Sequence, residues 1–160
     1  MTKKELEKIA KEENIDIYTL EIPDELNGLY IDNNIFLKIT LAYLEQKRVL
    51  SHEMGHHFTL EGNNLLKKSG KDLQEFFANA WSYKTELPLE KLAFYKYNDY
   101  SIQDILEKEE ITENFLNETI NYYKERYGNE IIETDDYKIT FYPYFKVCKI
   151  DENFTEEEEY

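Results

Sequence analysis

The sequence predicts an α+β fold, in which a small antiparallel sheet packs against a helix that carries the segment HEMGH and against a second helix. Three observations predict this class. β-branched and aromatic residues dominate two early segments, residues 15–22 and 29–39. Apolar residues then recur at helical spacing from about residue 40 to 61, and again over residues 71–84. Further helical and strand patterns follow in the C-terminal part of the chain.

The first predicted elements are a helix and a hairpin. Residues 2–13 carry Leu6, Ile9 and Ala10 at helical spacing among charged residues, which predicts an amphipathic helix lying on the core. The segment 29–39 contains the turn formers Asp, Asn and Asn in succession. It therefore predicts a β-hairpin within the antiparallel sheet.

Two longer helices are predicted next. The first has a buried stripe, made of Leu44, Val49, Leu50 and Met54. It ends at the helix-stopping sequence Gly62-Asn63-Asn64. The apolar face of the second helix consists of Leu73, Phe76, Phe77, Ala80 and Trp81. Pro88 then closes this stretch or opens the next.

The C-terminal part is predicted to contain two short helices and a strand. Residues 101–108 and 113–126 have helical patterns, and Gly128 is suited to cap the second helix. The segment YKITFYPYFKV, residues 137–147, predicts a strand. The acidic residues 151–160 are expected to form a frayed tail.

The length of 160 residues predicts one compact domain. We expect this domain to cover residues 1–150, with a core at about 15–95 and a C-terminal extension at about 96–150, followed by the tail at 151–160. The chain has no internal repeat.

Charge and cysteine content exclude several function classes. Asp and Glu outnumber Lys and Arg by 34 to 19, and the net charge of -15 repels nucleic acid phosphates. The helical pair near residues 101–126 superficially resembles a helix-turn-helix, but its acidic charge disfavours DNA binding. The single Cys148 cannot form an internal disulfide, and the sequence has neither an apolar N-terminal signal nor a membrane-spanning run. We therefore expect a cytoplasmic protein that binds neither nucleic acid nor membrane.

The segment HEMGH predicts a metal site on the first long helix. His52 and His56 lie one helical turn apart on the same face, so both rings can reach one ion at roughly 2.0 to 2.1 Å. Glu53, on the neighbouring edge of the helix, is placed to contact a water bound to the metal. This combination is typical of a zinc peptidase in which a carboxylate acts as general base. The alternative, an exposed helix face rich in histidine, conflicts with the apolar residues around the motif.

A catalytic zinc ion normally has three protein ligands and one open position. The nearby acidic residues are Glu61, Asp72, Glu75 and Glu86. Glu75 lies beside the apolar face of the second predicted helix, so it is the expected third ligand. Asn79 follows one turn later and is expected to hydrogen-bond a ligand histidine and fix its orientation.

Other residues near the motif have less defined roles. Gly55 lies inside the helix at a cost of about 1 kcal/mol relative to alanine, which indicates close approach by another element. His57 projects about 100° away from His56, so it is not an expected ligand. Tyr30, His57 and Tyr83 remain alternatives as donors to a developing oxyanion.

The stretches VLSHEMGHHFT and QEFFANAWSYKTELPLEKL resemble the zinc-dependent ImmA/IrrE-type metallopeptidases of phages and mobile elements, whose HExGH helix is followed by an E-x-x-A-N-x-F-A segment. Glu75, Ala78 and Asn79 match that segment, whereas Trp81 and Ser82 depart from it conservatively. The resemblance covers about residues 15–145 and implies a zincin-like arrangement of the two helices.

The resemblance also implies a function: zinc-dependent endopeptidase cleavage of a helix-turn-helix repressor at a specific site, which relieves repression of a phage or mobile element. The strand near residues 35–39 is expected to lie at a sheet edge and to bind the extended substrate. The alternatives are a non-enzymatic antirepressor that contains zinc and a toxin-antitoxin component, each binding a basic DNA-binding partner. The presence of His52, Glu53, His56 and Glu75 together favours the enzyme.

Overall fold

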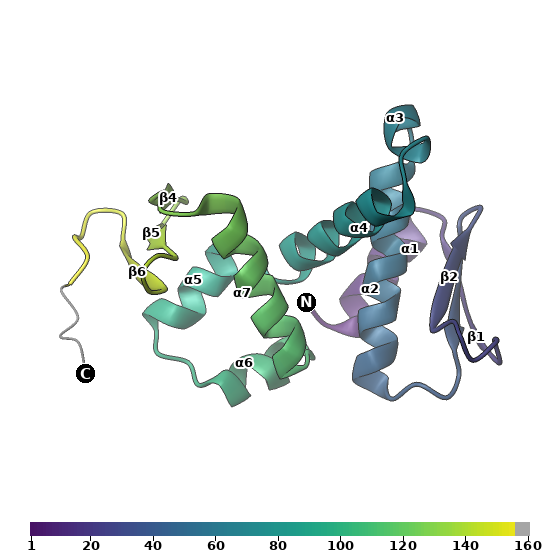
Figure 1. The fold of residues 1–160 in the computed structure, drawn as a ribbon. Helices are drawn as coiled ribbons and strands as arrows, with labels where there is room; N and C mark the ends of the chain where they lie inside the picture. The colour runs from purple at the N-terminus through teal and green to yellow at the C-terminus, as the bar shows by residue number, and fades with distance from the viewer. Residues whose placement is uncertain (156–160) are drawn as a thin grey trace.

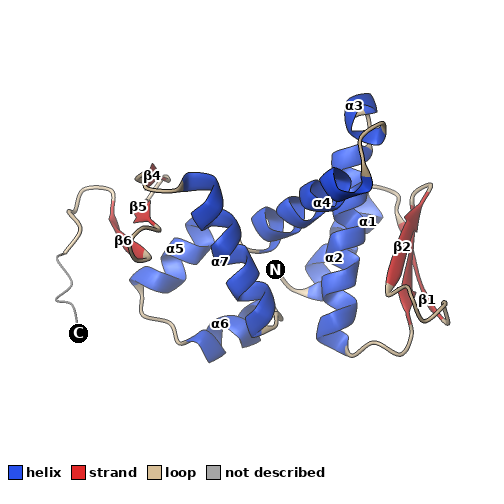
Figure 2. Cartoon of the chain, viewed as in Figure 1, coloured by secondary structure: helices blue, strands red, loops and turns tan. Residues whose placement is uncertain are grey.

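A computed structural model of the chain, which describes residues 1–155, has an N-terminal and a C-terminal lobe joined by a short connection (Figure 1). The N-terminal lobe contains α1 (Lys3–Glu12), β1 (Asp16–Leu20), β2 (Gly28–Ile31), β3 (Asn34–Lys38), α2 (Tyr43–Leu60), α3 (Asn64–Lys67) and α4 (Lys71–Glu86). The C-terminal lobe contains α5 (Leu89–Tyr97), α6 (Ile102–Glu109), α7 (Glu113–Tyr127), β4 (Ile132–Glu133), β5 (Tyr137–Thr140) and β6 (Lys146–Lys149). The predicted α+β class is confirmed, and Figure 2 shows the strands gathered at the two ends of the molecule.

The sheet of the N-terminal lobe has the strand order β1-β3-β2. The predicted hairpin is present: β2 and β3 are antiparallel, and the Asp32-Asn33 turn between them has positive φ at both residues, 47° and 63°. β1, however, runs parallel to β3, so the expectation of a wholly antiparallel sheet is wrong for this pair. The chain leaves β1 and forms β2 before β3 inserts between them. The residue pattern of a strand specifies its two faces but not the direction of its neighbour.

The central position of β3 contradicts the expectation that residues 35–39 form an edge strand. Ile35 and Leu37 point into the core, and β3 uses its backbone groups on both sides to pair with β1 and β2. The free edges of this sheet therefore belong to β1 and β2. An extended peptide can add only at one of these two strands.

Helix α2 lies between the sheet and α4 (Figure 1) and contacts β2, β3 and α4. Leu50 and Met54 of the predicted stripe are fully buried, whereas Leu44 near the start of the helix is exposed. The helix ends at Leu60, and Gly62 follows in a left-handed conformation with φ of 72°, as the helix-stopping sequence predicts. The predicted second helix is α4, but only Ala80 of its predicted apolar face is fully buried. Leu73, Phe76 and Phe77 are exposed.

The C-terminal lobe contains the two predicted helices as α6 and α7. The segment predicted as one strand is a hairpin of β5 and β6, interrupted at residues 141–145. Pro143 in this interruption has no backbone N–H, so it cannot continue a strand that pairs on both sides. The helices α3 and α5 were not predicted. The last five residues of the predicted acidic tail, 156–160, lie outside the described residues.

Buried hydrophobic residues form two clusters, one in each lobe. Leu6, Ile35, Leu50 and Met54 belong to the first, which fills the space between α1, α2 and the sheet. The second starts at Leu87 and joins α5, α6, α7 and β5. The organisation as one domain over residues 1–150 stays a prediction. Among the described helices, none is both long and apolar enough to cross a membrane.

Candidate metal centre

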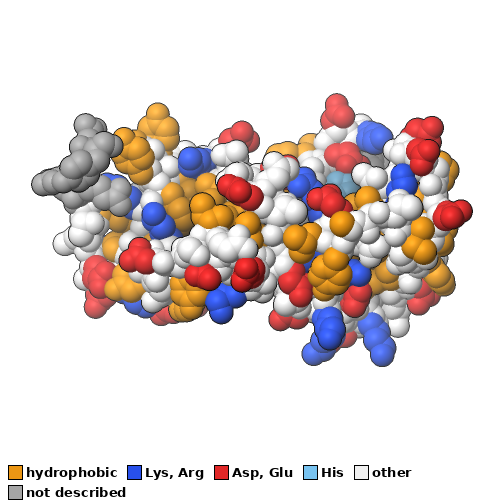
Figure 3. Space-filling view, turned by 90° about the horizontal axis from the view of Figure 1, so that it is seen from below, with side chains coloured by type: hydrophobic (Ala, Val, Ile, Leu, Met, Phe, Trp, Pro, Cys, Tyr) orange, Lys and Arg blue, Asp and Glu red, His pale blue; other side chains and the backbone are white. Residues whose placement is uncertain are grey.

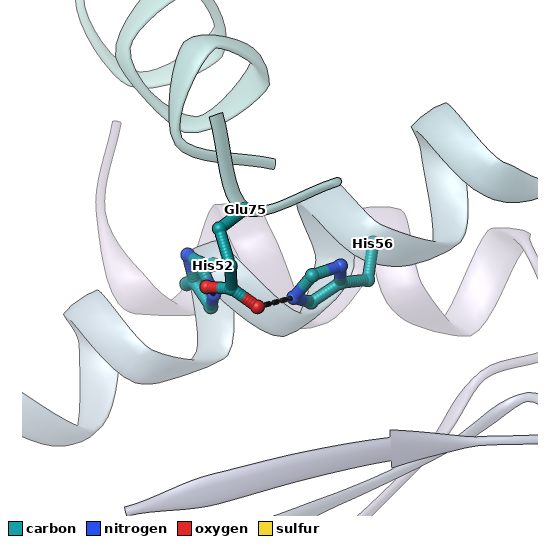
Figure 4. Close-up of side chains that lie close together, drawn as sticks. All are labelled: His52, His56 and Glu75. Carbon is teal, nitrogen blue, oxygen red and sulfur yellow. Dashed lines mark ion pairs between the residues drawn. The ribbon is translucent and has the colours of Figure 1, made fainter. Parts of the chain in front are cut away.

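The structure brings together the three predicted metal ligands. His52 and His56 project from one face of α2, and Glu75 reaches them from α4 (Figure 4). His52 Nε2 lies 2.8 Å from Glu75 Oε2, and His56 Nε2 lies 3.0 Å from Glu75 Oε1. One ligand atom from each residue lies within 4.8 Å of the other two. Within the described part of the chain, this is the group of side chains arranged to hold a metal ion.

The donor chemistry fits a divalent metal. His52 Nδ1 lies 2.8 Å from Asn79 Oδ1, so Nδ1–H donates to the amide oxygen. This contact leaves the lone pair of Nε2 directed at the position shared with His56 and Glu75. Burial lowers the pKa of His56, which favours its neutral, metal-binding form. Two imidazoles and one carboxylate with an open side form the ligand set of a catalytic zinc site. Asn79 thus lies where the sequence predicted it.

The close approach of α2 and α4 depends on Gly55. A Cβ atom at this position would lie 2.4 Å from the carbonyl oxygen of Ala78 and 2.9 Å from its Cα, distances that no side chain tolerates against backbone. The missing side chain therefore lets α4 approach near enough for Glu75 to reach both histidines. This contact explains the glycine inside the helix.

Glu53 lies beside the ligand group but is not part of it. Its side chain lines the same cleft as His52 and Glu75, and the residue is only 8% exposed. Burial raises the pKa of Glu53 to about 7, and the nearby Glu75 carboxylate adds to this effect. His52 and hydrogen bonding from the backbone of Tyr30 act in the opposite direction. A carboxyl group with a pKa near neutral is suited to take up and release a proton.

Two of the three predicted ligands, His52 and Glu75, line a cleft of about 330 Å³. Its walls come from residues 25–28, from α2 and α4, and from Phe115 of the C-terminal lobe. Of the three alternatives for an oxyanion donor, Tyr83 lines this cleft, whereas Tyr30 lies at a separate hollow beside Leu60. His57 lines neither of these two hollows.

Sequence reasoning named Tyr83 but missed the ion pair beside its hydroxyl group, Arg48 and Glu118. Tyr83 donates its hydroxyl hydrogen to Glu118 Oε2 at 3.2 Å, and Arg48 Nη2 pairs with the same oxygen at 2.6 Å. Burial raises the pKa of Tyr83 to about 12, so its hydroxyl stays a donor. Arg48 lies one helical turn before His52, so the sequence alone could have placed both residues on one face of the helix. Glu118 comes from α7, and no sequence pattern links it to the site.

The family model described as the IrrE N-terminal-like domain, a model of peptidases, matches residues 10–121, more than half of the chain. The chain belongs to this family. The resemblance drawn from HEMGH and the later helix is thereby confirmed, and the protein is a metallopeptidase of the IrrE/ImmA type. No match was found among curated proteins. The region shared with the IrrE N-terminal-like family includes every residue of the metal group and also Arg48, Phe115 and Glu118.

Proposed function

We propose that this IrrE N-terminal-like protein is a zinc-dependent endopeptidase, with His52, His56 and Glu75 as metal ligands and Glu53 as general base. The observation that carries the proposal is the convergence of these three ligands beside a buried carboxyl group at an open cleft. When bound, zinc supplies Lewis acidity to a carbonyl oxygen and to a water molecule. Two imidazoles and one Glu carboxylate are a protein ligand set of catalytic zinc sites.

Three side chains of the protein have separate roles in the proposed reaction. Glu53 accepts a proton from the attacking water and passes it to the nitrogen of the leaving amine. Asn79 holds the ring of His52 in one orientation and one tautomer. Tyr83 lines the cleft, and its hydroxyl becomes a donor to the substrate oxygen once its hydrogen turns away from Glu118.

The free edge of β2 is the proposed binding site for the extended substrate, in place of the central strand β3. Gly28 of β2 lines the cleft together with His52 and Glu53. A peptide that pairs with β2 therefore passes the ligand group. The absence of a side chain at Gly28 lets this strand pack directly against Val49 and Glu53 of α2.

The proposed substrate is a helix-turn-helix repressor of a phage or mobile element, which the protein would meet in the cytoplasm. Two observations support a basic partner. The net charge is -15, and Figure 3 shows Asp and Glu side chains spread over both lobes of the face in view. DNA-binding proteins carry the complementary charge. The link to a repressor itself comes from the ImmA/IrrE resemblance.

A paired experiment tests the proposal. Bound zinc is measured first, and the wild type and Glu53→Gln are then incubated with the repressor encoded nearest the gene. We expect one zinc ion per chain in both proteins, and cleavage by the wild type at least about 100-fold faster than by the variant. Glu61→Gln, which changes an exposed carboxyl at the end of α2, is the matched control and should cleave like the wild type.

Two other results would reject the enzyme. Tight repressor binding by both proteins without product would instead support the non-enzymatic antirepressor or a toxin-antitoxin role. Absence of zinc from carefully prepared wild-type protein would reject the metal site itself. Equal cleavage rates of the wild type and Glu53→Gln would show that Glu53 is not the general base.

A further inference from the structure

The third histidine of the chain, His57, has no role in the metal group. It is 5% exposed and lies on α2 next to His56, yet it contacts other elements. His57 Nδ1 lies 2.8 Å from Tyr30 Oη on β2, and its Nε2 lies 3.4 Å from Glu13 Oε2 at the end of α1. The rings of Tyr30 and His57 also meet edge to face, with centroids 5.6 Å apart. His57 therefore joins three elements at one buried point.

Strand β2 lies against α2 at the level of Glu53. A Cβ atom added at Gly28 would lie 3.3 Å from Glu53 Cγ and 2.3 Å from Val49 Cγ1. The strand is thus as close to the helix as a backbone without a side chain permits. A small shift of β2 changes the surroundings of the Glu53 carboxylate directly.

The register of the hairpin determines the direction in which the backbone N–H of Tyr30 points. Ile31 and Asn34 flank the two-residue turn and form its hydrogen-bonded pair. Hydrogen-bonded and non-hydrogen-bonded pairs alternate along an antiparallel ladder, so Tyr30, opposite Ile35, turns its N–H away from β3. The N–H of Tyr30 therefore points to the free edge of β2, while its side chain contacts His57.

We infer that the hydrogen bond between Tyr30 and His57 positions Glu53, by holding the edge strand β2 against α2, where Gly28 packs on the Glu53 side chain. This inference rests on the proposed function, in which Glu53 is the general base. Tyr30 and His57 are positioning residues, because they act on the reaction only through Glu53. The pair also keeps β2 fixed as the proposed edge for substrate binding.

Hydrogen exchange measures the strand position without any substrate. In ¹⁵N-labelled zinc-loaded protein, Tyr30→Phe and His57→Phe should each speed exchange of the Tyr30 amide by about 10-fold or more, while the buried amide of Leu50 in α2 stays unchanged. His57→Asn keeps a polar group beside Tyr30 and should restore most of the protection. Tyr18→Phe, on the other edge strand and exposed, is the matched control and should change neither amide.

Kinetics test the positioning role. In His57→Phe we expect kcat to fall by about 10-fold to 100-fold, with zinc content unchanged, with a smaller change in KM than in kcat, and with rescue by His57→Asn. Unchanged exchange of the Tyr30 amide in both Phe variants overturns the inference, and so does faster exchange with an undiminished kcat. If the wild type cleaves no repressor, the proposed function fails, whereas the exchange experiment still decides whether the hydrogen bond holds the strand. Tyr30→Phe keeps the ring, so it serves as the test if His57→Phe does not fold.

Discussion

Glu53 combines burial with a negative charge beside a second carboxylate. A buried carboxyl group is stabilised in its protonated form, and this stabilisation acts on folding as well as on catalysis. Its pKa is raised to about 7 because of burial, with Glu75 adding to the effect. The ionised Glu53 side chain therefore lowers the free energy of unfolding of the metal-free protein at alkaline pH.

Glu53→Gln should stabilise the metal-free protein at pH 8. An unfolded Glu titrates near 4.5 and the folded one near 7, so between these values the folded state holds the extra proton and stability falls as pH rises. Removing the charge should raise the free energy of unfolding by about 2 to 3 kcal/mol at pH 8, and by almost nothing at pH 4.5. Urea unfolding in chelator measures both values. Glu61→Gln is the control, and a difference independent of pH would contradict the assigned pKa shift.

Asn79→Ala should weaken metal binding without unfolding the protein. Asn79 accepts the hydrogen bond from His52 Nδ1, which fixes the tautomer that presents Nε2. We expect the dissociation constant for zinc to rise by about 10-fold to 100-fold. Competition with a chelating dye measures this change. Asn121→Ala removes an exposed amide from α7, and equal zinc affinity of Asn79→Ala and Asn121→Ala would show that the hydrogen bond does not support the ligand.

At the scale of elements, the site depends on the distance between α2 and α4. HEMGH supplies two ligands from one helix, but the third is useful only if α4 lies almost in backbone contact with α2. That contact is made at Gly55 and Ala78. The packing of Phe58 on Trp81, with stacked rings 4.8 Å apart, fixes the same pair of helices about one turn further along.

Gly55→Ala should separate the two helices and weaken metal binding. The new methyl group would lie 2.4 Å from the Ala78 carbonyl oxygen, so the backbone must shift. Overpacking of this kind costs about 1 to 3 kcal/mol of unfolding free energy, more than the gain in helix propensity of about 1 kcal/mol. Urea unfolding and zinc titration measure the two effects. Gly70→Ala adds the same atom where nothing lies within 4 Å, and it should leave zinc affinity unchanged.

At the scale of the whole molecule, a buried polar junction links the two lobes. Lys47 of α2 and Glu86 of α4 form an ion pair at 2.5 Å, and each residue is 1% exposed. Lys47 Nζ also donates to the backbone carbonyl of Glu109 in the C-terminal lobe. Burial lowers the pKa of Lys47, and the Glu86 carboxylate counteracts this effect. Near the cleft, Glu118 makes a second link to Arg48 and Tyr83.

Lys47→Met should destabilise the protein by about 3 to 5 kcal/mol, because it leaves the Glu86 carboxylate buried without its partner. The double variant Lys47→Met/Glu86→Leu removes both charges, so it should be more stable than Lys47→Met alone. Urea unfolding of the wild type, Lys47→Met, Glu86→Leu and the double variant gives the four unfolding free energies of a double-mutant cycle. Additive losses would show that the two charges do not stabilise one another.

Local spacing in the sequence is enough to predict the centre of the site. One helical turn separates His52 from His56, and this spacing fixes their common face wherever the helix lies. Glu75 and Asn79 were predictable for the same reason. They lie one helical turn apart on a second helix with an apolar face, and this spacing can be read from the sequence. The hairpin at Asp32-Asn33 was predictable from turn chemistry.

The elements that meet around that centre depend on long-range packing, which the sequence does not reveal. In the folded chain, β3 is the central strand and β2 is an edge strand. His57 is buried against Tyr30, and Tyr83 and Phe115 lie in the cleft wall. These relations join residues far apart in the chain. Helical and strand periods report which face of an element is buried, but they carry no information about which neighbour covers it. The spacing of the proposed ligands is therefore local, whereas the shape of the cleft and the position of Glu53 depend on how the elements pack.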